Sequence, residues 1–159
     1  MTSGTTGLAA LLSAVADRAA KAGVFGSVRV EGNTLRCDAL ASAEPAEFRV
    51  FEEKGTLWVS LVTSARWLSQ SIEADLVNTG DKIEELLEEE LVDLGWKKEW
   101  GPARLSYQHF RDDAKMYTFR TPLPVKAGDP RSIDIATMCL LGYEQTFRPL
   151  GDMEADEED

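Results

Sequence analysis

Residues 81–96 read DKIEELLEEELVDLGW, and the predicted fold is built around this segment. Large aliphatic side chains recur on one side of it at helical spacing, with acidic side chains on the other; the aliphatic stripe consists of Ile83, Leu86, Leu87, Leu91 and Leu94. Asp81 can cap the first turn, and Gly95 stands where a left-handed helix end is expected. We therefore predict an acidic amphipathic helix whose leucine stripe packs on a sheet.

Strand-like sequence lies on both sides of this helix. Before it, apolar residues alternate with polar ones in two predicted hairpins, one turning at Gly32 and Asn33 and the other at Lys54 and Gly55. After it, residues 105–121 predict a third hairpin. The helix therefore divides a mainly antiparallel sheet into two parts.

Residues 65–78, ARWLSQSIEADLVN, fit two patterns. Leu68, Ile72 and Leu76 share the parity of a strand, and they also fit part of a helical stripe. The Asn-Thr-Gly sequence that follows at 78–80 is a poor place for a helix to continue and a good place for a strand to turn. We therefore predict a fifth strand before the central helix.

Two further helices are predicted towards the ends of the chain. An alanine-rich leucine stripe runs over residues 8–22, with Gly23 as the stop. Asp129 followed by Pro130 is a strong helix start, and the helix that continues to about residue 147 is apolar nearly all round, as in a buried groove or a subunit interface. The predicted fold class is α+β, a mainly antiparallel sheet with an N-terminal, a central acidic amphipathic and a C-terminal helix, in a single domain over residues 1–150.

The composition is that of an acidic globular protein. Among 159 residues, 17 basic and 28 acidic side chains give a formal net charge of −11, which argues against a nucleic-acid partner. Residues 151–159, GDMEADEED, hold six acids and no base, and we predict a disordered tail there. No apolar run is long enough for a membrane helix, and Asp17 and Arg18 interrupt the apolar N-terminal stretch. We therefore expect a cytoplasmic protein without a membrane partner.

Sequence motifs for a phosphate cradle, a nucleophile elbow or a two-cysteine redox site do not occur, so no cofactor and no catalytic residue are predicted. The glutamates within residues 84–90 have no histidine near them and are interpreted as a solvated helix face rather than a metal site. Cys37 and Cys139 lie among apolar neighbours and are predicted to be buried free thiols.

One alternative places chemistry around His109, the only histidine. Polar and aromatic side chains flank apolar ones on the strands predicted there, so His109, Tyr107, Arg120 and Glu73 could form a small-ligand or enzyme pocket in a sheet cavity. The simpler interpretation is a histidine that is hydrogen-bonded at the edge of the sheet.

Four tryptophans are the other distinctive feature. Tryptophan is large, seldom wholly buried and enriched at interaction surfaces. Trp58 is assigned to the core of the sheet. Trp67, Trp96 and Trp100 stand beside charged or turn residues, where ordinary edge packing is the simpler interpretation, and they are the candidate residues for a partner-binding or dimer surface.

The order of the predicted elements resembles that of the class I type III secretion chaperones of the Tir-chaperone kind and of the YbjN-like bacterial proteins that share their fold. The resemblance rests on the succession of elements over residues 8–22, 28–63, 81–94, 105–121 and 130–147. It implies a small, acidic, cytoplasmic and usually dimeric protein without enzymatic activity. Such proteins bind extended segments of other proteins through apolar grooves on the sheet and first helix, which adds Leu12 and Val15 to the candidate partner surface.

The leading hypothesis is therefore a non-catalytic protein-binding module, chaperone-like or adaptor-like. It would hold a segment of a partner protein, or a second copy of itself as a homodimer, on apolar sheet and helix surface. The alternatives are a ligand-binding protein or enzyme with its site near His109, and a structural subunit of a larger assembly.

Overall fold

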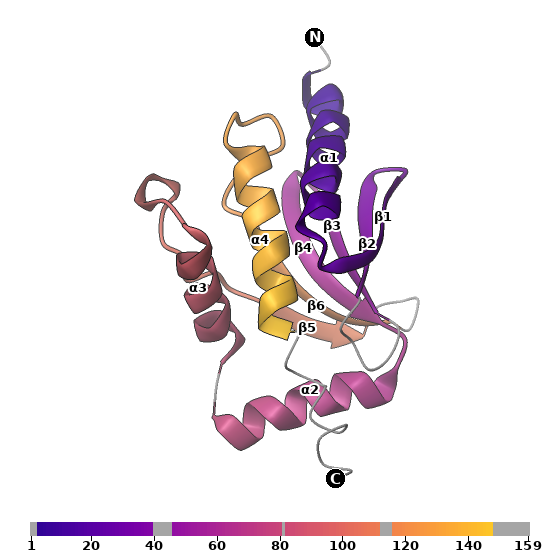
Figure 1. The fold of residues 1–159 in the computed structure, drawn as a ribbon, viewed down its shortest axis with the longest axis vertical. Helices are drawn as coiled ribbons and strands as arrows, with labels where there is room; N and C mark the ends of the chain where they lie inside the picture. The colour runs from indigo at the N-terminus through magenta and orange to yellow at the C-terminus, as the bar shows by residue number, and fades with distance from the viewer. Residues whose placement is uncertain (1–2, 40–45, 81, 112–115, 148–159) are drawn as a thin grey trace.

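The computed structural model describes residues 3–39, 46–80, 82–111 and 116–147. Within these ranges the chain forms four α-helices and a six-stranded antiparallel sheet of order β1-β2-β3-β4-β6-β5 (Figure 1). The strands are β1 (Phe25–Glu31), β2 (Thr34–Ala39), β3 (Glu47–Glu53), β4 (Thr56–Thr63), β5 (Gln108–Arg111) and β6 (Tyr117–Pro122). The predicted α+β class, with helices before, between and after the strands of an antiparallel sheet, is confirmed.

Two helices cover one face of the sheet, which we call the covered face. α1 (Ser3–Ala22) and α4 (Ser132–Phe147) pack against each other and against strands β1 to β4, and α3 (Ile83–Leu94) lies on the outer side of α4 (Figure 1). Strand residues that point towards these helices, such as Leu35, Val50 and Val59, are buried with them in one hydrophobic core. No described helix packs on the opposite side of the sheet, which we call the open face.

α4 is the central helix of the covered face. Ile135, Leu140 and Tyr143 are fully buried, and the Tyr143 hydroxyl lies 2.7 Å from the Thr121 hydroxyl on β6. The backbone N–H of Arg131 donates to a side-chain oxygen of Asp129, which satisfies a free donor where the helix starts. The prediction of a buried, mostly apolar helix that starts after Asp129 is confirmed.

α3 confirms the helix predicted in the central segment. Ile83, Leu87 and Leu91 are buried, and Gly95 ends the helix in the left-handed conformation with a φ of 104°. Its stripe does not pack on the sheet as predicted, because α4 lies between them and α3 packs on α4. The contact is close: a Cβ on Gly142 of α4 would stand 2.9 Å from a terminal methyl carbon of Leu91. The predicted cap, Asp81, lies outside the described residues.

The prediction of a strand over residues 65–78 was wrong, because this segment forms α2 (Arg66–Thr79). Leu68, Ile72 and Leu76 are spaced by four, a distance that keeps residues on one side of a strand and also on one side of a helix. Gly80 ends the helix with a φ of 76°, and its N–H donates to the carbonyl of Leu76. The glycine that we interpreted as a turn after a strand is therefore a helix cap.

Both cysteines are buried free thiols, as predicted. Burial raises the pKa of the Cys37 thiol to about 12 and also raises the pKa of Cys139, so neither forms a reactive thiolate at neutral pH. In the described part of the chain, no helix combines the length and the apolar character needed to cross a membrane.

Candidate functional site

A row of side chains crosses the open face, with one residue from each strand. The register of the five strand pairs places Arg29, Arg36, Arg49, Ser60, Arg120 and Gln108 opposite one another in that order. Because side chains alternate along a strand, all six point away from the face that α1 and α4 cover. The open face therefore carries four arginines in one line.

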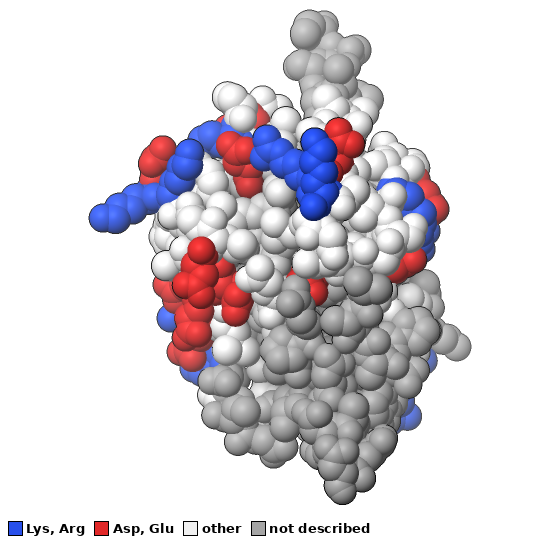
Figure 2. Space-filling view, in the orientation of Figure 1, with Lys and Arg blue, Asp and Glu red and all other residues white. Residues whose placement is uncertain are grey.

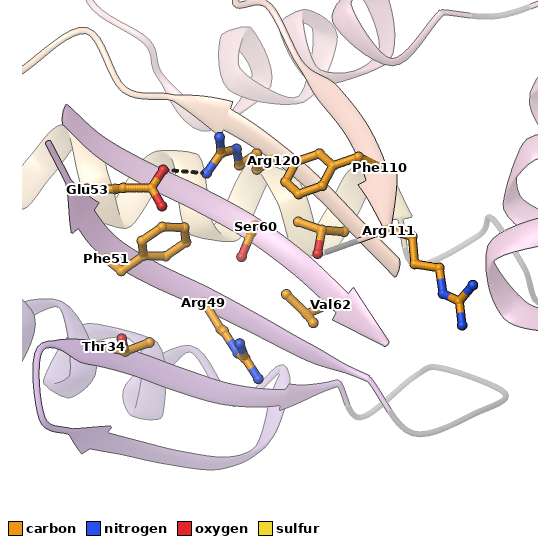
Figure 3. A pocket seen from close by; sticks show the side chains of 10 residues that line it. Thr34, Arg49, Phe51, Glu53, Ser60, Val62, Phe110, Arg111 and Arg120 are labelled. Atoms are coloured by element: carbon orange, nitrogen blue, oxygen red, sulfur yellow. Dashed lines mark hydrogen bonds and ion pairs between the residues drawn. The ribbon is translucent and has the colours of Figure 1, made fainter. Parts of the chain in front are cut away.

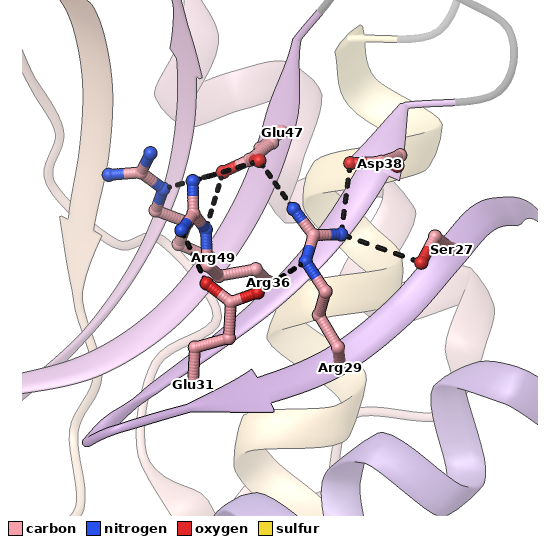
Figure 4. Close-up of polar contacts among 7 residues, drawn as sticks. All are labelled: Ser27, Arg29, Glu31, Arg36, Asp38, Glu47 and Arg49. Atoms are coloured by element: carbon pink, nitrogen blue, oxygen red, sulfur yellow. Dashed lines mark hydrogen bonds and ion pairs between the residues drawn. The ribbon is translucent and has the colours of Figure 1, made fainter.

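An ion-pair cluster joins three of these arginines at the β1–β3 side of the sheet (Figure 4). Glu47 accepts hydrogen bonds from Arg29 at 2.8 Å, Arg36 at 2.9 Å and Arg49 at 3.0 Å. Glu31 bonds Arg29 and Arg36 in addition. Partial burial alone would raise the pKa of Glu47, but the hydrogen bonds from Arg36 and Arg49 outweigh it and hold that pKa below its usual value.

Arg120 is held separately at the β6 side. Its guanidinium carbon lies 3.9 Å from the centre of the Trp58 ring and 5.0 Å from the centre of the Phe110 ring. The same guanidinium donates to Glu53 at 2.9 Å and to Gln108 at 3.0 Å. Trp58, which we assigned to the core, therefore lies partly buried beneath Arg120 on the open face.

Between these two groups the open face is hollowed. One hollow of about 460 Å³ is lined by Arg49, Ser60, Arg120, Phe51 and Phe110 among others (Figure 3). A second hollow of about 410 Å³ shares Arg49 and Val62 with the first. The two hollows therefore adjoin at Arg49 and Val62, and together we call them the open-face groove.

The charge of this face differs from that of the whole chain. The charged side chains of the open face have a formal net charge of +1. They are five arginines (Arg29, Arg36, Arg49, Arg111, Arg120) and four carboxylates (Glu31, Asp38, Glu47, Glu53). The whole chain carries −11. On the helix side, Asp and Glu side chains gather over α3 (Figure 2). The open face is therefore a place where an acidic group can approach this acidic protein.

The structure brings two of the four predicted pocket residues together. On the covered face, His109 Nδ1 lies 2.8 Å from a carboxylate oxygen of Glu73, and His109 Nε2 lies 3.2 Å from the hydroxyl of Ser69. The imidazole stacks on Phe119 with 3.8 Å between ring centres. Burial lowers the pKa of His109, which the Glu73 carboxylate opposes. A neutral ring with its proton on Nδ1 satisfies both partners.

The other two predicted pocket residues lie elsewhere. Tyr107 is partly buried against the core, and its pKa is raised by burial and by the charges of Glu84 and Glu73. Arg120 is on the opposite face of the sheet, because it follows Phe119 on β6 and neighbouring strand residues alternate between faces. The prediction that Arg120 shares a pocket with His109 was therefore wrong.

The Ser69–His109–Glu73 chain has the connectivity of a hydroxyl, a base and an orienting acid. Ser69 is only 3% exposed, so its hydroxyl is nearly closed off from a substrate. Ser69 and Glu73 are one turn apart on α2, and His109 is on β5. Both hydrogen bonds therefore attach α2 to the edge strand of the sheet.

The predicted partner residues on the first helix are not at the surface. Leu12 is 1% exposed and Val15 is 0% exposed, because both point from α1 into the core shared with the sheet. Their assignment to a partner surface is therefore corrected to a role in the core.

The tryptophans of the loop after α3 pack on each other. The rings of Trp96 and Trp100 meet edge to face at 5.1 Å, and Trp96 Nε1 donates to the carbonyl of Gly101 at 2.9 Å. Trp100 is 7% exposed and Trp96 is partly buried, so this pair closes the loop rather than offering a free surface. The side chain of Trp67 lies outside what the structure describes.

Sequence reasoning missed the arginine row, although a local signal exists. Each of the four arginines stands between two residues that its strand directs to the covered face, in the sequences VRV, LRC, FRV and FRT. A charged residue at that position predicts a polar open face on each strand. Which arginines line up depends on strand register, which a single strand does not reveal.

Among the described residues, no group of three or more His, Cys, Asp or Glu side chains is placed to hold a metal ion. Comparison with known proteins finds no family model, no curated protein and no solved structure that matches the chain.

Proposed function

We propose that this protein is a non-catalytic binding module that holds an extended segment of a partner protein in the open-face groove. The observation that carries the proposal is the groove itself, on a sheet face that no described helix covers. Its two adjoining hollows suit an elongated occupant better than a compact one. A chaperone-like or adaptor-like role, in a family related to the type III secretion chaperones, is the corresponding biological proposal.

The chemistry of the groove supports binding rather than proton transfer. Four arginines and three carboxylates line it, and the arginines stay protonated at neutral pH and present several fixed N–H donors. Phe51, Phe110 and Val62 add apolar and aromatic surface between them. Arginine and aromatic side chains together are the residues most often found at the centres of protein interfaces.

Site-specific photo-crosslinking in the cell of origin tests this proposal. We expect a photoreactive amino acid at Phe110 or at Arg111, which both line the groove and are exposed, to crosslink the same partner protein. The matched control is Val92 on α3, a residue 59% exposed on the other side of the molecule.

Equal crosslinking from Val92, or none from the two groove positions, would contradict the proposal. A crosslinked product that consists of two copies of this chain would instead identify the occupant as a second copy. That result would make the open face a homodimer interface.

A second candidate function rests on the Ser69–His109–Glu73 chain. In an acyl-transfer enzyme, the Ser69 hydroxyl would attack an ester carbonyl while His109 Nε2 takes its proton. The ester C–O bond would then break, and the leaving alcohol would take that proton from His109 as the acyl group stays on Ser69. Because Ser69 is 3% exposed, we expect a fluorophosphonate probe to leave the folded protein unlabelled. Labelling at Ser69 that disappears in the His109→Gln variant would establish the enzyme instead.

A further inference from the structure

Ser60 is the least explained residue of the open-face groove. Its side chain is 0% exposed, and its hydroxyl oxygen has no hydrogen-bond partner in the part of the chain that the structure describes. Buried polar atoms nearly always have a partner, so the unpaired Ser60 hydroxyl leaves a donor for a group that binds here. Ser60 also lines the groove, where Figure 3 shows it at the centre.

Two arginines flank Ser60 on the neighbouring strands. Arg49 of β3 and Arg120 of β6 are its direct cross-strand partners on the same face. Arg49 uses its Nε to reach Glu47, and Arg120 uses Nε and Nη1 to reach Gln108 and Glu53. Among the described residues, both Nη atoms of Arg49 and Nη2 of Arg120 therefore remain as donors for a ligand.

We propose that Ser60, Arg49 and Arg120 together bind one carboxylate of an acidic segment of the partner protein. This inference rests on the proposed function and gives the partner a chemical class. In this structure the two guanidiniums reach Glu47 and Glu53. On binding they would turn towards the carboxylate from two sides while the Ser60 hydroxyl donates from the floor of the groove, which would give charge-assisted hydrogen bonds. Ser60 is 0% exposed, so binding requires a neighbouring side chain to move and open the hydroxyl to the ligand.

The surroundings of this trio favour a carboxylate with an apolar neighbour. Val62 follows Ser60 by two residues on β4, and Phe110 lies on the same side of the groove as Arg120 (Figure 3). Glu47 and Glu53 border the site, and they repel a doubly charged phosphate more than a singly charged carboxylate. The expected occupant is therefore an extended segment in which Asp or Glu stands near a large apolar residue.

Fluorescence anisotropy with the full-length protein tests the inference. The probe is a labelled nonapeptide with three glutamates and two phenylalanines, and its counterpart carries glutamine at the three acidic positions. We expect the acidic peptide to bind about tenfold more tightly than the counterpart. Ser60→Ala and Arg49→Gln should each weaken its binding by about tenfold, as loss of one charged hydrogen bond does.

Arg104→Gln is the matched control for net charge. Arg104 pairs with Glu88 of α3 and does not line the groove, so its replacement should leave the affinity unchanged within about twofold. Equal binding of the two peptides, or wild-type affinity in the Ser60→Ala variant, would overturn the inference. So would stronger competition by inorganic phosphate than by acetate at the same concentration.

The thermal stability of the Ser60→Ala variant tests the carboxylate assignment independently of peptide binding. Removing an unpaired buried hydroxyl should leave the melting temperature unchanged or raise it. A lower melting temperature together with unchanged peptide affinity would mean that a structural water satisfies the hydroxyl, and the carboxylate assignment would be wrong. If Phe110 still crosslinks a partner in that case, the proposed function stands without this inference.

Discussion

Replacing Phe119 by alanine is expected to remove about 3–5 kcal/mol from the free energy of unfolding, the usual range for a buried phenylalanine. Phe119 is 1% exposed, stacks on His109 and lies 5.2 Å from the ring of Phe147. It therefore joins β5, β6 and α4. Because small domains are stable by only about 5–15 kcal/mol, urea unfolding should show a much lower midpoint.

Phe110 provides the matched control for this substitution. It lies on β5, beside the strand of Phe119, but it points to the open face and is 37% exposed. Phe110→Ala should cost less than about 1 kcal/mol, as for most surface substitutions. Equal losses at the two positions would mean that the covered and open faces are wrongly assigned.

The pKa of His109 provides a second measurement of the Phe119→Ala substitution. Burial lowers its pKa in the folded protein, and removal of the Phe119 ring lets water reach the imidazole. The pKa of His109 should therefore rise towards its usual value in the Phe119→Ala variant. Since the chain contains a single histidine, its proton resonances can be followed by NMR without assignment.

The sequence predicted those elements whose pattern is local and unambiguous. In α3, the stripe, the acidic side and Gly95 all indicate a helix, and the structure agrees. In residues 65–78 the same three apolar positions fit a strand and a helix, and only the role of Gly80 separates the two. Apolar residues spaced by four therefore do not distinguish a strand from a helix when the glycine that follows fits both a turn and a helix cap.

The candidate site was harder to predict, because it is assembled across strands. His109 and Glu73 were grouped correctly from their polar character, but the Ser69 hydroxyl came from a helix that we had taken for a strand. Arg120 was assigned to the wrong face, since a one-residue difference along β6 reverses the direction of the side chain. The arginine row depends on the register of six strands, which long-range packing determines.

Glu47→Gln is expected to destabilise the protein by about 1–3 kcal/mol at neutral pH, because charged hydrogen bonds are worth about 1.5–3 kcal/mol each when shielded from water. Glu47 is 18% exposed and accepts from three arginines, whose side chains are 26–32% exposed. Water screens these pairs in part, which keeps the total below the sum of the separate bonds. Without the carboxylate, the guanidiniums of Arg29, Arg36 and Arg49 repel one another.

The pH dependence of this effect has a definite sign. The pKa of Glu47 is lower in the folded protein than its usual value of 4.5, so its contribution is fully present above pH 4.5 and is lost as the pH falls through the folded pKa. Urea unfolding from pH 7 down to pH 3 should therefore show the difference between wild type and Glu47→Gln shrinking in acid, since a protonated Glu47 resembles glutamine. Glu52→Gln, on the same strand at an exposed position without a described ion pair, should stay near wild type throughout. A Glu47→Gln difference that is constant with pH would mean that the Glu47 carboxylate does not hold Arg29, Arg36 and Arg49 together.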